Sequence, residues 1–174
     1  MAAIVILIVI GWTQRHRFVP LEAGSPVPSY SGTKLNGEPF HLDSLRGKVV
    51  LLNVWATWCR PCTQEMPAIE ALYRELNSEG LEVVAVSTDA APGGLDAFGQ
   101  PGGDVERFVH DYGLTFTIVH DPEKRIEQVM QVIGLPTTLI IDREGRIVRK
   151  VLGAEPWDDA EHIAEMRKLL KKGR

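Results

Sequence analysis

The residues of this 174-residue chain that could do chemistry are concentrated in "VWATWCRPCTQEMP", which holds both of its cysteines. Cys59 and Cys62 enclose Arg60 and Pro61. Proline favours the first position of a helix, so we expect the Cys59 sulfur to lie at a helix N-terminus, beside the positive charge of Arg60. Free N–H groups and the helix dipole at that place stabilise a thiolate and lower the pKa of a thiol. The pattern predicts a reversible disulfide, in which Cys59 attacks a partner's disulfide and Cys62 resolves the mixed disulfide.

Other roles for the cysteine pair fit less well. As a structural staple, the pair would close a loop too short to save much chain entropy. Covalent haem attachment would need a histidine directly after the second cysteine, where the chain has Thr63. A structural zinc site normally needs four ligands. The histidines that could join the cysteines lack the usual ligand spacing: His16, His41, His110, His120 and His162. We therefore expect no metal and no cofactor.

Hydrophobic patterning surrounds the cysteine pair with alternating strands and helices. Continuous apolar runs over residues 48–56 and 81–88 predict two buried strands, and a helical stripe over residues 61–76 lies between them. Two strands joined by a helix form a parallel βαβ unit. Asn36-Gly37 predicts a β-hairpin that precedes this unit. The remaining predicted elements are a helix over 105–112, a strand over 115–120, a helix capped by Asp121 that ends before Gly134, a hairpin over 137–153 and a helix that begins near Pro156.

The N-terminus has a different character. "MAAIVILIVIGW" is uncharged and lacks a polar face, although it is shorter than the about 20 apolar residues of a membrane-spanning helix. We expect residues 1–12 to be a membrane anchor truncated at its start, with a buried first strand as the alternative. Arg15 and Arg17 conflict with this expectation, because the positive-inside rule holds such a flank in the cytoplasm. Residues 13–28 are expected to be a linker, and residues 29–174 a single domain.

Three motifs together closely resemble the thioredoxin superfamily: "GKVVLLNVW", "WATWCRPCTQEMP" and "GLPTTLIIDREGRIV". The similarity is greatest to the TlpA/ResA/CcmG-like, membrane-anchored branch of redoxin (AhpC/TSA-type) domains, and it covers about residues 25–172. It implies an α/β thioredoxin fold with a central mixed β-sheet flanked by helices, here with an N-terminal β-hairpin extension. It also implies thiol–disulfide exchange without a cofactor. The implied partners are protein disulfides or dithiols, apocytochrome c among them, and a membrane thiol reductase that supplies electrons.

The resemblance also assigns roles by position. Cys59 becomes the exposed nucleophile and Cys62 the resolving thiol. Pro136 matches the family's cis-proline, which faces the disulfide. This arrangement would leave the Leu135 carbonyl and the Thr137 N–H to pair with an extended partner peptide, as in β-strand addition.

Further site residues follow from the same comparison. Ordinary thioredoxins carry a buried aspartate six residues before the first cysteine, whereas this chain has Asn53, which cannot titrate. Six residues after the first cysteine, Glu65 matches a glutamate of the ResA-like branch and is the expected acid/base for the resolving thiol. The alternative for Glu65 is a solvated residue that complements the helix dipole. Trp58, Arg60 and Pro61 are expected to contact the partner.

The glycine-rich stretch from Asp89 to Asp104 follows the second buried strand. Its start is expected at the same sheet edge as the cysteines, because the carboxyl ends of parallel strands share one edge. We expect it to border the substrate groove and to contribute to partner choice, with a plain surface insertion as the alternative.

The leading functional prediction is a thiol–disulfide oxidoreductase that acts mainly as a reductant in cytochrome c maturation or a related thiol pathway. Its domain would lie in the periplasm or otherwise outside the cytoplasmic membrane, as a monomer. A peroxiredoxin-type thiol peroxidase would need threonine at Ala56, and a copper-handling protein would space its cysteines four apart and add a histidine ligand. The net charge of −4 argues against nucleic acid as a partner.

Overall fold

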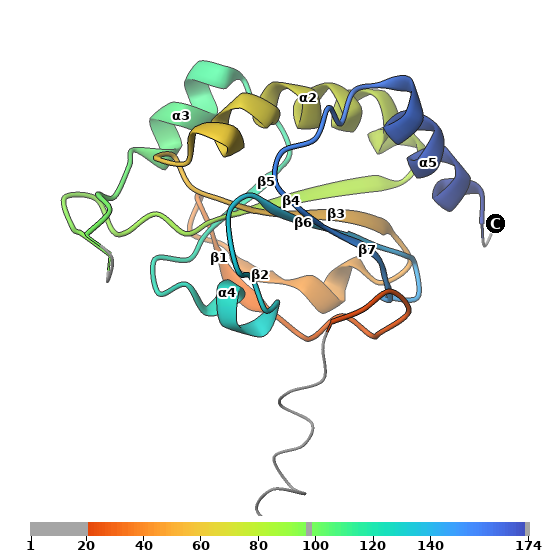
Figure 1. Cartoon of the computed structure of the whole chain (residues 1–174), viewed down its shortest axis with the longest axis horizontal. Helices are drawn as coiled ribbons and strands as arrows, with labels where there is room; N and C mark the ends of the chain where they lie inside the picture. The colour runs from red at the N-terminus through yellow and green to blue at the C-terminus, as the bar shows by residue number, and fades with distance from the viewer. Residues whose placement is uncertain (1–20, 97–98, 173–174) are drawn as a thin grey trace, which may run out of the picture.

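A computed structural model of the chain describes residues 21–96 and 99–172 (Figure 1). The predicted anchor, residues 1–12, lies outside this range, as does the predicted linker up to residue 20. The rest of the linker packs on the domain. Val27 is buried, and the N–H groups of Gly24 and Val27 donate to the carbonyls of Ile147 and Gly145 at 2.7 and 2.9 Å. The packed domain therefore begins before Ser29.

A seven-stranded mixed sheet forms the centre of the molecule, in the order β2-β1-β5-β4-β3-β6-β7. Neighbours are parallel for β3–β4 and β4–β5 and antiparallel elsewhere. The strands are β1 (Ser31–Lys34), β2 (Pro39–His41), β3 (Val49–Trp55), β4 (Leu81–Ser87), β5 (Thr117–His120), β6 (Thr137–Ile141) and β7 (Ile147–Leu152). The mixed sheet and the N-terminal hairpin of β1 and β2 confirm the predicted fold class. Gly37 makes the tight turn of this hairpin possible, because its φ of +84° is one that L side chains rarely adopt.

Helices cover both faces of the sheet (Figure 1). Three of them, α2 (Arg60–Leu76), α3 (Val105–Tyr112) and α5 (Ala160–Lys171), lie over one face, and α4 (Arg125–Val129) lies over the other. Short 3-10 turns, η2 (Leu42–Leu45) and η3 (Asn77–Glu79), complete the fold. The central strands are thus covered on both sides, as their continuous apolar runs predicted.

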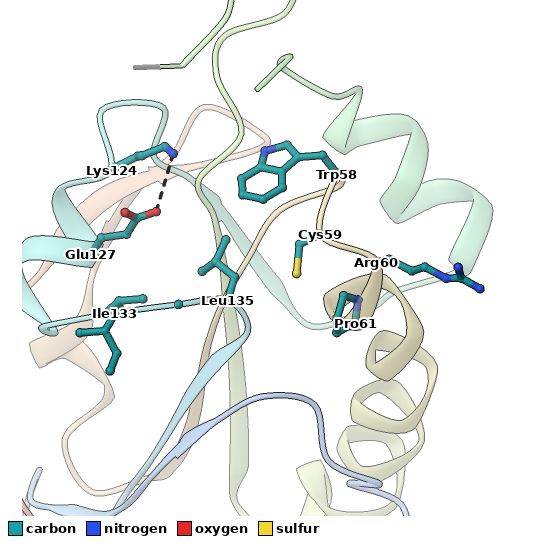
Figure 2. A pocket seen from close by; sticks show the side chains of 10 residues that line it. Trp58, Cys59, Arg60, Pro61, Lys124, Glu127, Ile133 and Leu135 are labelled. Carbon is teal, nitrogen blue, oxygen red and sulfur yellow. Dashed lines mark ion pairs between the residues drawn. The ribbon is translucent and has the colours of Figure 1, made fainter. Parts of the chain in front are cut away.

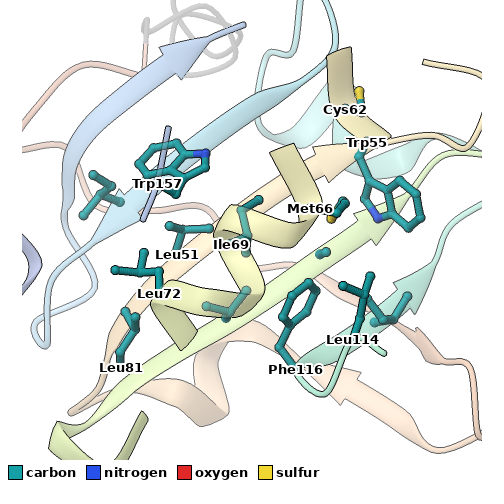
Figure 3. Packing of buried hydrophobic residues seen from close by; sticks show 14 of the residues in the cluster. Leu51, Trp55, Cys62, Met66, Ile69, Leu72, Leu81, Leu114, Phe116 and Trp157 are labelled. Carbon is teal, nitrogen blue, oxygen red and sulfur yellow. The ribbon is translucent and has the colours of Figure 1, made fainter. Parts of the chain in front are cut away.

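The period of two along β3 divides its side chains between two hydrophobic clusters. Leu51 and Trp55 pack with α2, whereas Leu52 and Val54 face the cluster that contains Ile126 of α4. Figure 3 shows Met66, Ile69 and Leu72 of α2 packed on the sheet. These three side chains and Leu76 are fully buried. Each such side chain contributes about 1.5–3 kcal/mol on burial. This packing fixes the start of α2 relative to the end of β3.

Two predicted helix starts were wrong. Asp121 does not cap a helix that begins at Pro122: Lys124 adopts a φ of +55°, and the Asp121 carboxylate accepts the Ile126 N–H at 2.8 Å. The helix is therefore confined to α4. The last helix begins at Ala160 rather than near Pro156, because the carboxylate of Asp159 accepts the His162 N–H and caps it there.

Candidate active site

The cysteine pair lies where β3 runs into α2. Cys59 and Cys62 form a disulfide with their Cα atoms 5.3 Å apart. Cys59 is the N-cap of α2, and its sulfur accepts the backbone N–H of Cys62 at 3.4 Å. Pro61 occupies the first turn, where its missing N–H costs no helical hydrogen bond. The predicted position of the sulfur at a helix N-terminus is confirmed, and this position stabilises a thiolate.

The two cysteines differ in access to solvent. Cys59 is 6% exposed and Cys62 is fully buried. Of the two cysteines, a partner can therefore reach only Cys59 without a rearrangement. Cys59 was predicted to be an exposed nucleophile, and its exposed surface is smaller than that prediction implied. This order agrees with attack by Cys59 and resolution by Cys62.

A groove of about 570 Å³ opens in front of the Cys59 sulfur. Figure 2 shows Trp58 and Leu135 pointing into it, whereas the guanidinium of Arg60 points away. Its lining comes from the start of α2 with the turn before it, from α4 and from the residues on either side of α4: Trp58, Cys59, Arg60, Pro61, Lys124, Glu127, Val132, Ile133, Gly134 and Leu135. The predicted contact residues Trp58, Pro61 and Leu135 thus meet in one place.

The Leu135–Pro136 peptide bond is cis, as predicted. Within the described ranges, neither the N–H nor the carbonyl of Leu135 makes a hydrogen bond. Since both backbone groups belong to a residue that lines the groove, they can pair with an extended peptide laid along it.

The backbone N–H of Thr137, unlike the backbone groups of Leu135, is not free to pair with a peptide. Thr137 begins β6, is 1% exposed, and pairs with Val54 on one side and Leu152 on the other. The Gly153 N–H donates to the Pro136 carbonyl at 2.9 Å, so Thr137 and Leu152 form the non-hydrogen-bonded type of pair. The N–H of Thr137 is therefore directed at β3, and the sheet itself uses the donor that was predicted to bind a peptide.

Glu65 is buried rather than solvated. It is 3% exposed and lies one helical turn after Cys62 on α2. One carboxylate oxygen, Oε1, accepts from Asn53 Nδ2 at 2.8 Å; the other, Oε2, accepts from Trp157 Nε1 at 3.0 Å and from the Glu155 N–H at 3.3 Å. Burial raises the pKa of Glu65, and the three hydrogen bonds oppose that rise. The alternative of a solvated first-turn glutamate is wrong.

Asn53 takes a structural place beside this carboxylate. Its side chain lies on the α2 side of β3, because it shares the odd-numbered positions of the strand with Leu51 and Trp55. Its Nδ2 group donates to Glu65 and also to Thr138 Oγ1 at 2.9 Å. The residue that replaces the titratable aspartate of ordinary thioredoxins therefore holds the glutamate in position.

A second buried carboxylate supports the turn that carries the cysteines. Asp89, at the end of β4, is fully buried and accepts from the N–H and hydroxyl of Thr57 at 2.9 and 2.5 Å. It also accepts from the Ser87 hydroxyl at 2.7 Å and the Gly103 N–H at 3.2 Å. A Cβ on Gly103 would lie 1.8 Å from the Thr57 hydroxyl oxygen, so only glycine fits there. Asp89 thus ties the turn before Cys59 to both ends of the glycine-rich stretch.

The glycine-rich stretch reaches the groove only indirectly. Of its described residues, none lines the groove, but Asp96 pairs with Lys124, which does. No sequence pattern marked Lys124 as a groove residue, and Asp89 was expected only as the first residue of the glycine-rich stretch. Trp157 was also missed, because its partner Glu65 is 92 positions away and no spacing rule joins the two.

Residues 21–96 and 99–172 contain no group of three or more His, Cys, Asp or Glu side chains placed to hold a metal ion. In that part of the chain, no helix has the length and apolar character needed to span a membrane.

The fold and the disulfide site together define the class of protein. A disulfide at the N-terminus of the helix after β3, with a cis-proline directly before the neighbouring strand β6, is the arrangement of a thioredoxin-fold thiol–disulfide site. The comparison with known proteins agrees. Residues 23–150 match the AhpC/TSA family.

Individual relatives carry the same activity in their names. Thiol-disulfide oxidoreductase ResA of Geobacillus kaustophilus is 35% identical over 166 residues, which are 93% of this chain and 90% of that protein. ResA of Bacillus subtilis is 35% identical over 133 residues, 76% of this chain and 69% of that protein. The solved structure of a Chlorobium tepidum protein described as thiol:disulfide interchange protein DsbE has 29% identity and a TM-score of 0.73, and the match covers 86% of this chain and 99% of that one. The chain belongs to the AhpC/TSA family and is a thiol-disulfide oxidoreductase of the ResA and DsbE type.

Proposed function

We propose that this oxidoreductase acts outside the cytoplasmic membrane, mainly as a reductant, in cytochrome c maturation or a related thiol pathway. Its substrates are protein disulfides, those of an apocytochrome c among them, and a membrane thiol reductase returns it to the dithiol form. The N-terminal apolar segment tethers it to the membrane. One observation carries the reaction: the Cys59 sulfur lies at the N-terminus of α2 and faces a groove lined by Leu135, whose backbone N–H and carbonyl have no hydrogen-bond partner among the described residues.

The reaction proceeds by two exchanges. The Cys59 thiolate attacks one sulfur of the partner's disulfide, which forms a mixed disulfide and releases the partner's first thiolate. Cys62 then gives its proton to Glu65 and attacks the Cys59 sulfur, which restores the Cys59–Cys62 disulfide and releases the partner's second thiolate. The partner gains two electrons, and the protein loses two. In this scheme Glu65 accepts the proton at a buried site, where water does not compete for it.

The reduction potential of the Cys59–Cys62 pair tests the direction of this reaction. The full chain, in mild detergent, would be equilibrated with mixtures of reduced and oxidised dithiothreitol. A value near that of thioredoxin, about −270 mV, or lower supports a reductant. A value near that of DsbA, about −120 mV, contradicts reduction of apocytochrome c. Protease accessibility of the native chain in spheroplasts tests the location, and protection of the domain would contradict it.

A further inference from the structure

Lys124 stands at the rim of the groove and takes no part in the exchange reaction. Its ammonium nitrogen lies 2.5 Å from Asp96 Oδ2 and 4.0 Å from Glu127 Oε1. The Asp96 side chain is 2% exposed and that of Lys124 is 16% exposed, so this is a largely buried ion pair. Lys124 also has a φ of +55°, which lysine seldom adopts. Backbone and side chain together hold the ammonium group in one place.

The ammonium group that is held there faces the ring of Trp58. It lies 5.8 Å from the ring centroid, within the range of a cation–π interaction. Trp58 directly precedes Cys59 in the chain, and Figure 2 shows its ring between Lys124 and the Cys59 sulfur. Asp96 of the glycine-rich stretch therefore contacts Lys124, and Lys124 in turn contacts Trp58, the residue next to the nucleophile.

Apolar surface surrounds the sulfur at this point. Trp58 is 36% exposed and Ile133 is 86% exposed, and both line the groove together with Leu135. Apolar side chains that gather beside a reactive atom favour a ligand that covers them with apolar surface of its own. The charged groups at the rim do not oppose this, because the positive charge of Lys124 is offset by Asp96 and Glu127.

We propose that Lys124, held by Asp96, is a positioning residue that fixes the Trp58 ring as one wall of the groove and so sets a preference for partner segments with an apolar side chain beside the reacting cysteine. The inference rests on the proposed function and names the chemistry of its substrate. The chemical step is unchanged: the partner's sulfur still exchanges with Cys59. A small dithiol occupies only the space at the sulfur, so its reaction does not depend on the wall.

The test uses the full chain, reduced, with two peptide disulfides that differ only in a leucine or a serine next to the cysteine. We expect the wild type to prefer the leucine peptide in kcat/KM. Lys124→Met removes the charge but keeps an apolar stem, and it should lower that preference about two- to fivefold, through KM. Lys124→Arg keeps a cation and should restore the preference. Lys34→Met, which breaks an exposed ion pair on the β1–β2 hairpin, should behave as wild type.

Reduction of the Cys59–Cys62 disulfide by dithiothreitol separates positioning from chemistry. Its rate should be the same in wild type and in Lys124→Met. Lys124→Met leaves Asp96 without this partner, so the double variant Asp96→Asn/Lys124→Met carries the same test if the single variant does not fold. An unchanged leucine preference in either folded variant overturns the proposal, as does a parallel loss of the dithiothreitol reaction. A wild type that reduces neither peptide would refute the proposed function instead.

Discussion

Trp157 and Glu65 meet inside the protein, where the indole N–H donates a hydrogen bond of 3.0 Å to Oε2 of the carboxylate. The same oxygen accepts the N–H of Glu155, and two residues earlier the N–H of Gly153 donates to the carbonyl of Pro136. The short segment 153–157 therefore contacts both the cis-proline that follows the groove residue Leu135 and the buried acid one helical turn after Cys62. It sets where Glu65 lies and how strongly that carboxylate holds a proton.

Glu65→Gln tests whether this carboxylate accepts the proton of Cys62. Burial raises the pKa of Glu65 above its usual value. In the wild type, the rate at which Cys62 resolves the mixed disulfide should rise as pH passes through that raised pKa, because only the carboxylate form accepts a proton. Glutamine removes this step, so we expect a rate lower on the order of a hundredfold near neutral pH. Stopped-flow release of a chromophoric thiol from pH 5 to 9 measures it.

The control for this variant is Glu75→Gln, an exposed position on the same helix α2. Its pH profile should match that of the wild type. Equal resolving rates and equal profiles for Glu65→Gln and the wild type would show that Cys62 loses its proton to another group.

Glu65 should also make stability depend on pH. Its folded-state pKa is raised, so the folded protein binds a proton more tightly than the unfolded chain does. The stability from that proton is fully present below the unfolded pKa and is lost as pH rises through the folded pKa. The free energy of unfolding of the wild type and of Glu65→Gln should be measured by denaturation across this window. As pH rises, the wild type should lose stability relative to the glutamine variant. A difference that stays constant with pH would contradict the raised pKa.

Trp157→Phe tests the indole donor alone. Phenylalanine keeps an aromatic ring in the core but removes one of the three hydrogen bonds to Glu65. The carboxylate form loses a donor, so the pKa of Glu65 should rise further and the profile of the resolving step should move to higher pH. In the Glu65→Gln background the same substitution should leave the profile unchanged. A shift that persists in that background would mean that Trp157 acts on the cysteines by another route.

The sequence predicted local features better than contacts between distant segments. Pro61 and the apolar stripe of α2 mark a helix start at the cysteines, and Gly37 marks a turn, because these signals lie within a few residues of the structure they specify. Asp121-Pro122 carries the same type of signal, yet the left-handed backbone at Lys124 redirects the Asp121 carboxylate to Ile126. A propensity rule cannot anticipate that change.

The residues that hold the site in place, Asp89 and Trp157, are not marked by any signal in the nearby sequence. Thr57 and Asp89 are 32 positions apart, and Trp157 and Glu65 are 92 apart. Thr57 and Asp89 meet because the neighbouring strands β3 and β4 end at the same edge of the sheet, and Trp157 and Glu65 meet because the segment after β7 packs against α2. Periodicity reports which face of an element is apolar, but it does not report which polar groups meet across elements.

Single cysteine variants test the order of attack. Cys62→Ser should accumulate a mixed disulfide between Cys59 and a peptide disulfide, because the attacking thiol remains and the resolving thiol is absent. Cys59→Ser should form little adduct, because Cys62 is fully buried. Mass spectrometry of the quenched reaction measures both species. Adduct formation at Cys62 at a rate similar to that at Cys59 would contradict the assigned roles.

Asp89→Asn tests the carboxylate beneath the cysteine turn. Four donors converge on the two oxygens of Asp89, and an asparagine offers one oxygen and an amide group that cannot accept. At least one buried donor then loses its partner, which should lower the free energy of unfolding by about 1–3 kcal/mol. Urea denaturation measures the loss. Asp111→Asn, at an exposed position on α3, is the matched control and should change stability little.

Asp89→Asn should also slow thiol–disulfide exchange, because it weakens the hydrogen bonds that join the turn before Cys59 to the end of β4. We expect kcat/KM for a peptide disulfide to fall while the reduction potential of the Cys59–Cys62 pair changes little, since the helix N-terminus at Cys59 remains intact. Recovery of stability without recovery of kcat/KM, on addition of a stabilising osmolyte, would confirm that Asp89 positions the turn. Full recovery of both would show that Asp89 contributes only to stability.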